Sequence, residues 1–450
     1  MKRITFCILW TLISINVFSA RTDFYVDGIG YRVISFSDIL TCEISDGTTC
    51  TGDIVIPETI TYQSKTINVI RIGDDAFKGA LITSVKISKN ITDIGRGAFS
   101  SCEKLKTATI PENCNMDDDA FRDCTSLTSI VLPNSCYSIS DGTFYGCSSL
   151  KYVKANNITS IGSNAFAYCS SLNSITLPNV TYLGDGCFRS CESLKSIEAK
   201  KITYIGDYSF EFCKSLSSFK LNNSSMDIGI GAFYACNSLT SIEIPENSKI
   251  DTRAFADCTS LSSIVIHKNV KPVENAEGIF ENCPITTLST ASPFLLNNTG
   301  TLNNNINKSI LKKITLLEGY QFLYTISTPY PDGTTVVTQE GEKFGWYEME
   351  NMDELISLSS EPPSMLGSFS RNQYLYLKVT VPTEALAAYQ QADVWKNFWN
   401  LQGGATTSIN TPTVDANNND TPIYDIGGRK VKETVKGQIY IKNGKKFIAR

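Results

Sequence analysis

A chain of 450 residues exceeds one ordinary globular core, so its length favours several domains or one elongated repeat array. Its 42% hydrophobic and 19% charged residues are the composition of a folded protein and exclude a mainly disordered chain. The net charge of -5 is mild and the 40 basic residues are scattered, which argues against a nucleic-acid partner.

Residues 1–20 are predicted to be a secretory signal peptide. Two basic residues give the charged start, Ile4 to Phe18 the apolar segment, and Ser19 and Ala20 the small residues of a cleavage site. The alternative is a membrane anchor, but about fifteen apolar residues are fewer than the roughly twenty that span a bilayer. We therefore expect a secreted or cell-surface protein with no transmembrane segment after cleavage.

From Phe77 to Phe280 the sequence repeats. Ten phenylalanines recur at spacings of 22, 22, 23, 22, 22, 22, 23, 22 and 25 residues, and nine of them are followed three residues later by cysteine. A period of this length predicts a solenoid, whose units bury their apolar faces only by stacking on one another. The general unit reads IGxxAFxxCxSLxSIxLP, and ten units would span roughly 50 Å at the spacing of strands in a sheet.

The second half of the unit predicts a short strand. In the copy that begins at Ile161, the apolar residues Leu172, Ile175 and Leu177 fit a parallel strand with one face turned inward. Pro178 then ends the strand, because proline cannot donate a ladder hydrogen bond.

The first half of the unit predicts a turn. Gly162 supplies a conformation that larger residues resist. Ala165, Phe166 and Cys169 lie at helical spacing, so a single turn of helix could point all three side chains inward.

The unit AFxxCxSLxSIxLP resembles the BspA-type leucine-rich repeat, common in surface and secreted proteins of Bacteroidetes and of some host-associated protists. The match covers about residues 50–290. It implies an α/β solenoid, a right-handed array of about ten repeats over 71–290 with a parallel sheet on one face. The segments "FYVDGIGYRVIS" and "GDIVIPETITYQSKTINVIRIG" resemble the strands that open such arrays, which implies an N-terminal β cap over 21–70. Ala80 replaces the expected cysteine in the first copy, as fits a capping repeat.

The repeat predicts a core ladder of one phenylalanine and one cysteine per unit. Parallel stacked thiols rarely reach the torsion that a disulfide requires, so we interpret these cysteines as small buried hydrophobic residues. A zinc site is the alternative, but it calls for CxxC pairs or several histidines. The ladder comprises Phe99, Cys102, Phe121, Cys124, Phe144, Cys147, Phe166, Cys169, Phe188, Cys191, Phe210, Cys213, Phe233, Cys236, Phe255 and Cys258, and Cys283 closes its row of thiols.

The remaining cysteines leave a disulfide open. Cys42 and Cys50 are eight residues apart in the N-terminal segment of an exported chain and are the better candidates for a bond, with free thiols as the alternative. Cys114 and Cys136, one repeat apart, are a weaker pair.

The sequence offers little for catalysis. His267 is the single histidine, and its place at the end of a strand favours a surface role over that of a general base. The run from Asp117 to Asp119 lacks the alternating ligands and glycine of a calcium loop and is interpreted as a solvated turn. No phosphate-binding or dinucleotide-binding motif is present. We expect neither an enzyme, nor a cofactor, nor a metal.

The outward face of the strands is the candidate binding surface. One outward row is nearly uniform in hydroxyl residues, which neighbouring hydrogen bonds can explain without a ligand. The other varies in charge and size, as either a recognition surface or ordinary solvent exposure would. That second row comprises Lys86, Thr109, Val131, Lys154, Thr176, Glu198, Lys220, Glu243 and Val265.

The period fails after Pro284, and residues 291–403 are predicted to form a small α+β C-terminal cap region. Strands are expected around "EGYQFLYTIS" and "YLYLKVTVP", followed by a helix that Thr383 caps and that runs through Trp395 to Trp399. Its aromatic residues are interpreted as core, with a carbohydrate platform as the alternative.

Two segments complete the chain. Residues 404–421, rich in Thr, Asn, Gly and Asp, predict a linker. Residues 422–450 alternate apolar and polar positions around a type I′ hairpin turn at Asn443 and Gly444, and resemble the C-terminal sorting tails of Bacteroidetes proteins.

The resemblance implies a non-catalytic surface or secreted protein, a monomer that binds a host or neighbouring-cell protein or a glycan. A structural spacer that displays the C-terminal region, or an enzyme within residues 291–403, remain the alternatives.

Overall fold

The computed structural model describes residues 23–35, 39–219, 225–292, 306–318, 323–329, 335–341, 349–363, 369–405, 423–425, 430–431, 439–442 and 445–448. The predicted signal peptide and Lys220 lie outside these residues. The chain forms two compact units, Met1–Ala405 and Thr406–Arg450. Within the described ranges, no helix combines the length and the apolar character needed to cross a membrane.

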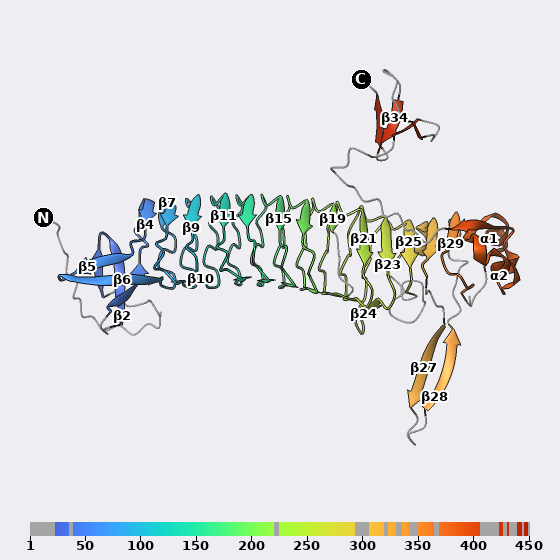
Figure 1. Cartoon of the computed structure of the whole chain (residues 1–450), viewed down its shortest axis with the longest axis horizontal. Coiled ribbons are helices and arrows are strands. Elements are labelled where there is room, and N and C mark those ends of the chain that lie inside the picture. Colours follow the sequence, from blue (N-terminus) through green and yellow to red (C-terminus); the bar gives the residue numbers. More distant parts are fainter. Residues whose placement is uncertain are drawn as a thin grey trace. The chain divides into compact units, whose positions relative to one another are not determined.

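A mixed sheet opens the first unit (Figure 1). Its strands are β1 (Phe24–Val26), β2 (Ile29–Ser35), β3 (Thr41–Asp46), β5 (Thr59–Tyr62) and β6 (Lys65–Ile72). β1, β2 and β3 pair antiparallel in turn, whereas β3 and β6 pair in parallel. The ring of Phe24 lies 4.0 Å from that of Tyr62 and 5.9 Å from that of Tyr31, so aromatic contacts fill this cap.

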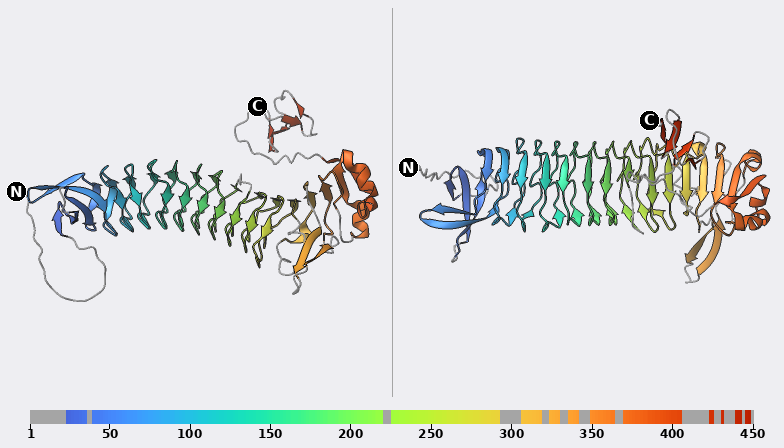
Figure 2. Two further views of the ribbon diagram at one scale, coloured as in Figure 1. Left: turned by 60° about the horizontal axis from the view of Figure 1, so that its bottom comes forward. Right: turned by 45° about the horizontal axis from the view of Figure 1, so that its top comes forward.

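Short parallel strands form the broad face of the repeat stack, one strand per unit (Figure 2). Ser174 and Thr176 are exposed and Ile175 between them is buried, which is the alternation expected of a one-faced strand. Hydrogen-bonded pairing groups the strands as β4–β7–β9, β11–β13, β15–β17–β19 and β21–β23–β25. They are β4 (Thr51–Val55), β7 (Leu81–Lys86), β9 (Thr107–Thr109), β11 (Ser129–Val131), β13 (Tyr152–Lys154), β15 (Ser174–Thr176), β17 (Ser196–Glu198), β19 (Ser218–Phe219), β21 (Ser241–Ile244), β23 (Ser263–Ile266) and β25 (Thr287–Thr290).

A second, narrow ladder of two-residue strands runs along another side of the stack, and the sequence analysis did not predict it. Its first two strands continue the sheet that contains β6, so the N-terminal sheet and the repeats share hydrogen bonds, and its other seven strands form a separate sheet. The strands are β8 (Asp93–Ile94), β10 (Asn115–Met116), β12 (Ser138–Ile139), β14 (Ser160–Ile161), β16 (Tyr182–Leu183), β18 (Tyr204–Ile205), β20 (Asp227–Ile228), β22 (Lys249–Ile250) and β24 (Lys271–Pro272).

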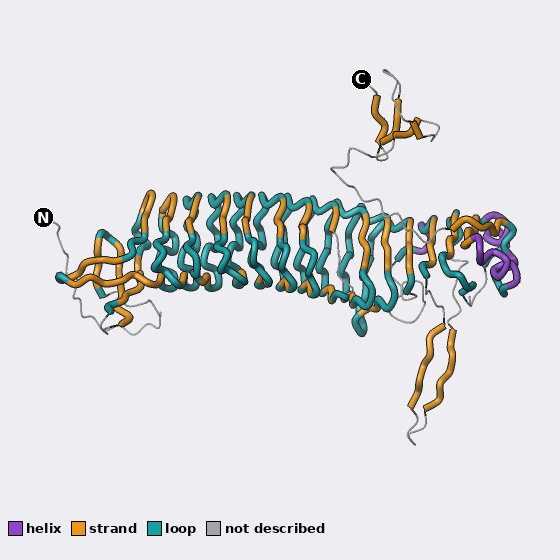
Figure 3. Tube along the Cα trace, in the orientation of Figure 1, coloured by secondary structure: helices purple, strands orange, loops and turns teal. Residues whose placement is uncertain are grey.

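The turn of helix expected in each unit is wrong. Figure 3 shows turns and short strands, but no helix, in the repeats that the structure describes. Asn164 and Tyr168 have φ angles of 55° and 63°, which a right-handed helix excludes. The N–H groups of Asn164, Phe166 and Tyr168 donate to carbonyls of the next unit at 2.7–2.8 Å. The intervening N–H groups of Ala167 and Cys169 donate three residues back at 3.1 Å, so bonds between units alternate with turn bonds and no helix forms.

Gly162 is required for a different reason from the one predicted. Its φ is not in the left-handed region, but a Cβ atom there would lie 2.8 Å from the backbone nitrogen of Asp141 in the preceding unit. A Cβ at Gly184 would lie 2.7 Å from the backbone nitrogen of Ser163 in the same way. Glycine therefore permits the close approach of successive units.

The phenylalanines form a continuous column of stacked rings inside the repeats. From Phe77 to Phe280, neighbouring ring centroids lie 5.0–5.8 Å apart and the planes differ by at most 16°. Every phenylalanine and cysteine of the predicted ladder is buried. The thiol of Cys169 donates to the carbonyl of Phe144, one unit earlier, at 3.2 Å, and the other eight thiols make the same bond at 3.0–3.2 Å. Cysteine thus joins adjacent units as well as filling space.

The broad sheet continues beyond the point where the sequence period fails. β25 pairs in parallel with β26, and the ladder proceeds to β29, β30 and β31. The loss of the period after Pro284 therefore marks insertions between strands and not the end of the sheet. The added strands are β26 (Lys313–Leu316), β29 (Glu354–Ser357), β30 (Lys378–Pro382) and β31 (Asn400–Ala405), and the inserted hairpin is β27 (Leu323–Pro329) with β28 (Thr335–Gly341).

The long helix predicted after Thr383 is wrong. The segment is divided into η4 (Thr383–Ala385), α2 (Leu386–Gln391) and η5 (Trp395–Asn397), and Thr383 caps none of them. Val394, with φ 70°, interrupts the helical path. Among the described residues, the other helices are η2 (Lys308–Ile310) and α1 (Arg371–Tyr376), the latter covering residues that we expected to be strand.

The aromatic residues after α2 divide between core and surface. Trp395 and Phe398 are buried, and the indole N–H of Trp395 donates to the carbonyl of Pro363 at 2.9 Å. Trp399 is 79% exposed, so the core interpretation fails for this residue alone.

The second unit contains four antiparallel strands, β32 (Ile423–Asp425), β33 (Lys430–Val431), β34 (Ile439–Lys442) and β35 (Lys445–Ile448). Lys442 pairs with Lys445, which leaves Asn443 and Gly444 as the two loop residues of a hairpin. The loop itself lies outside the described residues, so its turn type stays a prediction.

Candidate binding surface on the broad sheet

Most of the predicted outward row lies on one exposed face of the broad sheet, because every second residue of each strand points away from the core. Lys220 lies outside the described residues. The exposed members are Lys86, Thr109, Val131, Lys154, Thr176, Glu198 and Glu243.

Val265 departs from the prediction of an open surface residue. It is half-buried against a small apolar cluster of Ala291, Leu317 and Leu358 on the outer side of the sheet. The sheet face is thus partly covered from β23 onward, and the candidate surface is restricted to the earlier strands.

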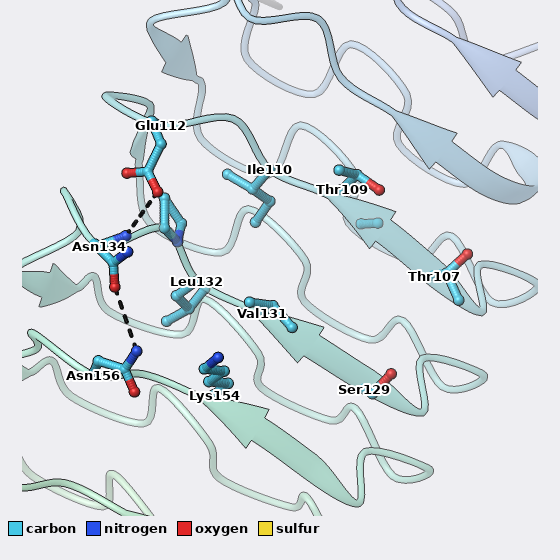
Figure 4. Close-up of a pocket in the computed structure, with 12 residues that line it drawn as sticks. Thr107, Thr109, Ile110, Glu112, Ser129, Val131, Leu132, Asn134, Lys154 and Asn156 are labelled. Atoms are coloured by element: carbon cyan, nitrogen blue, oxygen red, sulfur yellow. Dashed lines mark hydrogen bonds between the residues drawn. The ribbon is translucent and has the colours of Figure 1, made fainter.

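A groove of about 380 Å³ crosses β9, β11 and β13 and brings three residues of the predicted row together (Figure 4). Those residues are Thr109, Val131 and Lys154. Val131 is 54% exposed, an unusual fraction for a large apolar side chain, and the hydroxyls of Thr107 and Ser129 lie along the same strands. The groove is lined by Thr107, Ala108, Thr109, Ile110, Glu112, Ser129, Val131, Leu132, Pro133, Asn134, Lys154 and Asn156.

The rim of the groove is held by hydrogen bonds between successive units. The Glu112 carboxylate accepts from the backbone N–H groups of Ser135 and Asn134 at 3.2 and 3.3 Å, and these bonds lower its pKa. The side-chain amide of Asn156 donates to Oδ1 of Asn134 at 3.4 Å, which Figure 4 shows as a dashed line. The rim is therefore fixed in position, with a negative charge at its Glu112 corner.

The ammonium group of Lys154 supplies the opposite charge. Some lysines on the solenoid are neutralised, such as Lys214 by Glu192 at 2.8 Å and Lys378 by Glu354 at 2.7 Å, whereas others, such as Lys86, form no ion pair among the described residues. No ion pair to Lys154 forms among the residues that the structure describes. The charge of Lys154 is therefore available to a partner. The cation of Lys154, the anion of Glu112 and the apolar side chain of Val131 together can select a partner with a complementary surface.

The other residues singled out from the sequence are engaged elsewhere. Nε2 of His267 lies 2.8 Å from Oε1 of Glu243, away from the groove and 36% exposed. Asp119 pairs with Arg122 at 3.0 Å, and Asp118 accepts the backbone N–H of Asp141 at 3.2 Å. In the described part of the chain, no three side chains of metal-ligand type gather.

Among the described residues, five cysteines outside the ladder are free thiols, and one of them, Cys187, is fully buried beside the phenylalanine column. Burial raises the pKa of Cys42 and of Cys114 to about 12, and it also raises the pKa of Cys50 and of Cys136. The Cys42–Cys50 disulfide stays a prediction, to be tested by mass spectrometry of non-reduced peptides.

The sequence did not indicate one group of surface residues. Tyr168, Tyr208 and Phe212 lie on the edge formed by the AFxxC turns and have positive φ angles. They occupy variable positions of the unit, which a search for periodic residues passes over. Their large side chains distinguish these positions in the sequence, because glycine, aspartate or asparagine occupies the equivalent positions in several other units.

The stacked units, the buried phenylalanine column and the open sheet face define a leucine-rich-repeat solenoid protein. The family described as "BspA type Leucine rich repeat region" matches in six copies, within residues 57–170, 114–225 and 183–307. The matches together span more than half of the chain, so this protein belongs to that family.

Three solved structures illustrate the likeness. A leucine-rich repeat protein from Bacteroides ovatus is 20% identical, with 85% of this chain and 100% of that chain covered and a TM-score of 0.46. The T. pallidum leucine rich repeat protein is 25% identical over 47% of this chain and 88% of that chain, with a TM-score of 0.35. A leucine rich cell surface protein from Faecalibacterium prausnitzii is 18% identical over 85% of this chain and 95% of that chain, with a TM-score of 0.36. No curated protein matches.

Proposed function

We propose that this chain is an exported, non-catalytic binding protein whose broad sheet engages a protein on a host or neighbouring cell. The observation that carries the proposal is the groove over β9, β11 and β13, where the free ammonium of Lys154 lies near exposed Val131 and fixed Glu112. Short parallel strands give the surface a regular, rigid base on which such side chains hold their positions.

The chemistry of the surface favours recognition over catalysis. A catalytic site needs a nucleophile and a base within hydrogen-bond reach, and the polar residues of the groove are threonine, serine, asparagine, one glutamate and one lysine. These groups can donate, accept and exclude water around an apolar centre. A spacer protein would need no such groove, so binding to a partner discriminates the two functions.

Export by the predicted signal peptide and display by the predicted sorting tail are part of the same proposal. The family resemblance to surface and secreted proteins supports them. Sequencing of the protein that cells release or display tests both ends of the chain.

The experiment uses the full chain, because β25 pairs with β26 and a cut near residue 290 would expose a sheet edge. An array of purified extracellular-matrix and cell-surface proteins is probed with wild-type protein, with Lys154→Glu and with Lys86→Glu. Lys86 has the same chemistry in the same outward row but lies outside the groove, so it is a matched control.

Reversal of a charge that is buried in an interface lowers the binding affinity by about tenfold or more. We expect Lys154→Glu to weaken every array signal by this factor, and Lys86→Glu to leave the signals unchanged. Absence of any wild-type signal, or equal losses in the two variants, would contradict the proposed function.

A further inference from the structure

A second surface lies on the edge of the solenoid formed by the AFxxC turns. Five aromatic side chains from four of the five units between Phe144 and Phe233 lie on this edge, and we call them the aromatic ridge. They are Tyr145, Tyr168, Tyr208, Phe212 and Tyr234. Tyr168 and Tyr208 are 43% and 42% exposed, and the other three are half-buried.

The backbone of the ridge is strained where its side chains are large. Each AFxxC turn has one left-handed residue two positions before its phenylalanine and another two positions after it. Glycine, aspartate or asparagine fills most of these positions, as at Gly146 and Asn164. Tyr168, Phe212 and Tyr208 hold φ angles of 63°, 59° and 55°, which bulky residues rarely adopt.

The strained rings contact other rings of the ridge, Tyr168 with Tyr145 at 5.2 Å and Phe212 with Tyr234 at 5.7 Å between centroids, but they are not part of the core cluster. The phenylalanine column already fills the core beneath them, and Tyr168 and Tyr208 place over two fifths of their surface in water. The ring of Tyr208 lies over Gly231, where a Cβ atom would be 2.7 Å from its Cε1 atom. The positive φ angles of these residues cost free energy and place aromatic rings in contact with solvent. Such strain is typical of functional sites, so we expect the exposed rings to contact a ligand.

Arginines flank the ridge at both ends. The guanidinium of Arg122 lies 3.9 Å from the ring centre of Tyr145, and that of Arg253 lies 5.2 Å from the ring centre of Tyr234. Both are already neutralised, Arg122 by Asp119 at 3.0 Å and Arg253 by Glu281 at 3.4 Å.

The middle of the ridge is also neutral. Arg189 pairs with the buried Glu211 at 2.6 Å between Tyr168 and Phe212. Because every arginine has a carboxylate, the ridge offers planar apolar surfaces and hydrogen-bonding groups without free positive charge. A polyanion would gain little here.

We infer that the aromatic ridge is a binding site for a neutral polysaccharide. Sugar rings present flat patches of C–H groups that stack on exposed aromatic faces. The carboxylates beside the ridge are already engaged, Asp123 by Arg122 at 3.5 Å and Asp257 by Asn282 at 2.7 Å, so stacking on the rings is the main contact expected. Ser190 separates Tyr168 from Phe212 by two units, about 10 Å at the spacing of parallel strands. Because Ser190 is small, no third aromatic ring lies between Tyr168 and Phe212 at this position of the unit.

An extended peptide fits this edge less well. The N–H groups of Phe166, Tyr168 and Ser190 already donate to the next unit at 2.7–2.8 Å, so the edge offers no row of open backbone groups for strand addition. The polysaccharide site lies apart from the groove and does not depend on the proposed function of the sheet face.

The test is affinity electrophoresis of the full chain in native gels that contain soluble galactomannan, mixed-linkage β-glucan or yeast mannan, with heparin as the polyanion. Tyr168→Asn with Phe212→Asn is the ridge variant. Asparagine tolerates positive φ, so this variant should melt at the wild-type temperature or above it. Tyr137→Asn is the matched control, since Tyr137 is 62% exposed and its φ is not in the left-handed region.

We expect at least one neutral polysaccharide to retard the wild type, the ridge variant to lose at least tenfold in affinity, and Tyr137→Asn to behave as wild type. The melting temperature distinguishes lost contacts from lost folding. Migration unaffected by all three neutral polysaccharides, retardation by heparin alone, or retardation that survives in the ridge variant would overturn the inference. Lys154→Glu should be retarded as wild type, so the ridge and groove proposals can fail separately.

Discussion

Replacing Phe166 by alanine tests the central feature of the fold, the column of stacked rings. The Phe166 ring is fully buried, and its centroid lies 5.4 Å from those of both Phe144 and Phe188. Removing it leaves a void that these neighbours cannot close. Their backbones are held by bonds from Phe144 N–H to the Ala165 carbonyl and from Phe166 N–H to the Cys187 carbonyl, each 2.8 Å.

We expect Phe166→Ala to lower the free energy of unfolding by about 4 to 5 kcal/mol, which is near the upper end of the range for such substitutions. In a solenoid each unit contacts only its neighbours, so the destabilisation should concentrate in the units of Phe144, Phe166 and Phe188. Thermal melts measure the total effect, and hydrogen exchange followed by mass spectrometry locates it.

Lys154→Ala is the matched surface variant. Lys154 is exposed on the outward row, so we expect its replacement to change the free energy of unfolding by about 0.5 kcal/mol or less. An unchanged melt for Phe166→Ala, or a collapsed melt for Lys154→Ala, would mean that the inward and outward faces are assigned the wrong way round.

Three further predictions concern thiols, export and pH. The nine ladder cysteines should resist alkylation until the chain is denatured, and mass spectrometry that finds them paired would contradict the thiol column. The exported protein should begin at Ala20 or Arg21, and an intact Met1 on surface protein would argue against cleavage. Burial raises the pKa of Glu354, but hydrogen bonds from Lys313 and Lys378 outweigh it and leave the pKa below its ordinary value. The stability gained from ionised Glu354 is present above the ordinary carboxyl pKa of about 4.3 and is lost as the pH falls through the lower folded pKa. Glu354→Gln should therefore lower the melting temperature near pH 7 and not near pH 2, and equal effects at both would refute the pairing.

The sequence alone determined the period, the strand and the inward residues of the repeat. A strand alternates its faces, so Ile175 had to point inward and Thr176 outward once Leu172 fixed the register. The column of Phe166 and its equivalents followed from the same periodicity, because identical units that stack place identical side chains above one another.

The tertiary structure decided what depends on contacts between units. A helical turn at Ala165 and Phe166 satisfied local spacing, but bonds to the next unit were available and replaced it. The requirement for Gly162 comes from the backbone of the preceding unit, and the thiol of Cys169 finds its acceptor on Phe144, one unit earlier. Spacing within one unit contains none of this information.

The same limit applies to the candidate sites. The sequence placed Thr109, Val131 and Lys154 in one row, but only the stacked strands showed that a groove joins them. The structure also showed that Val265 is partly covered by the residues that directly follow β25, β26 and β29. Tyr168 occupied a variable position, and its left-handed backbone became visible only in three dimensions. A repeat determines its own core, because each core residue faces its copy in the next unit. Its surface depends on the residues that break the repeat and on what they meet when the chain has folded.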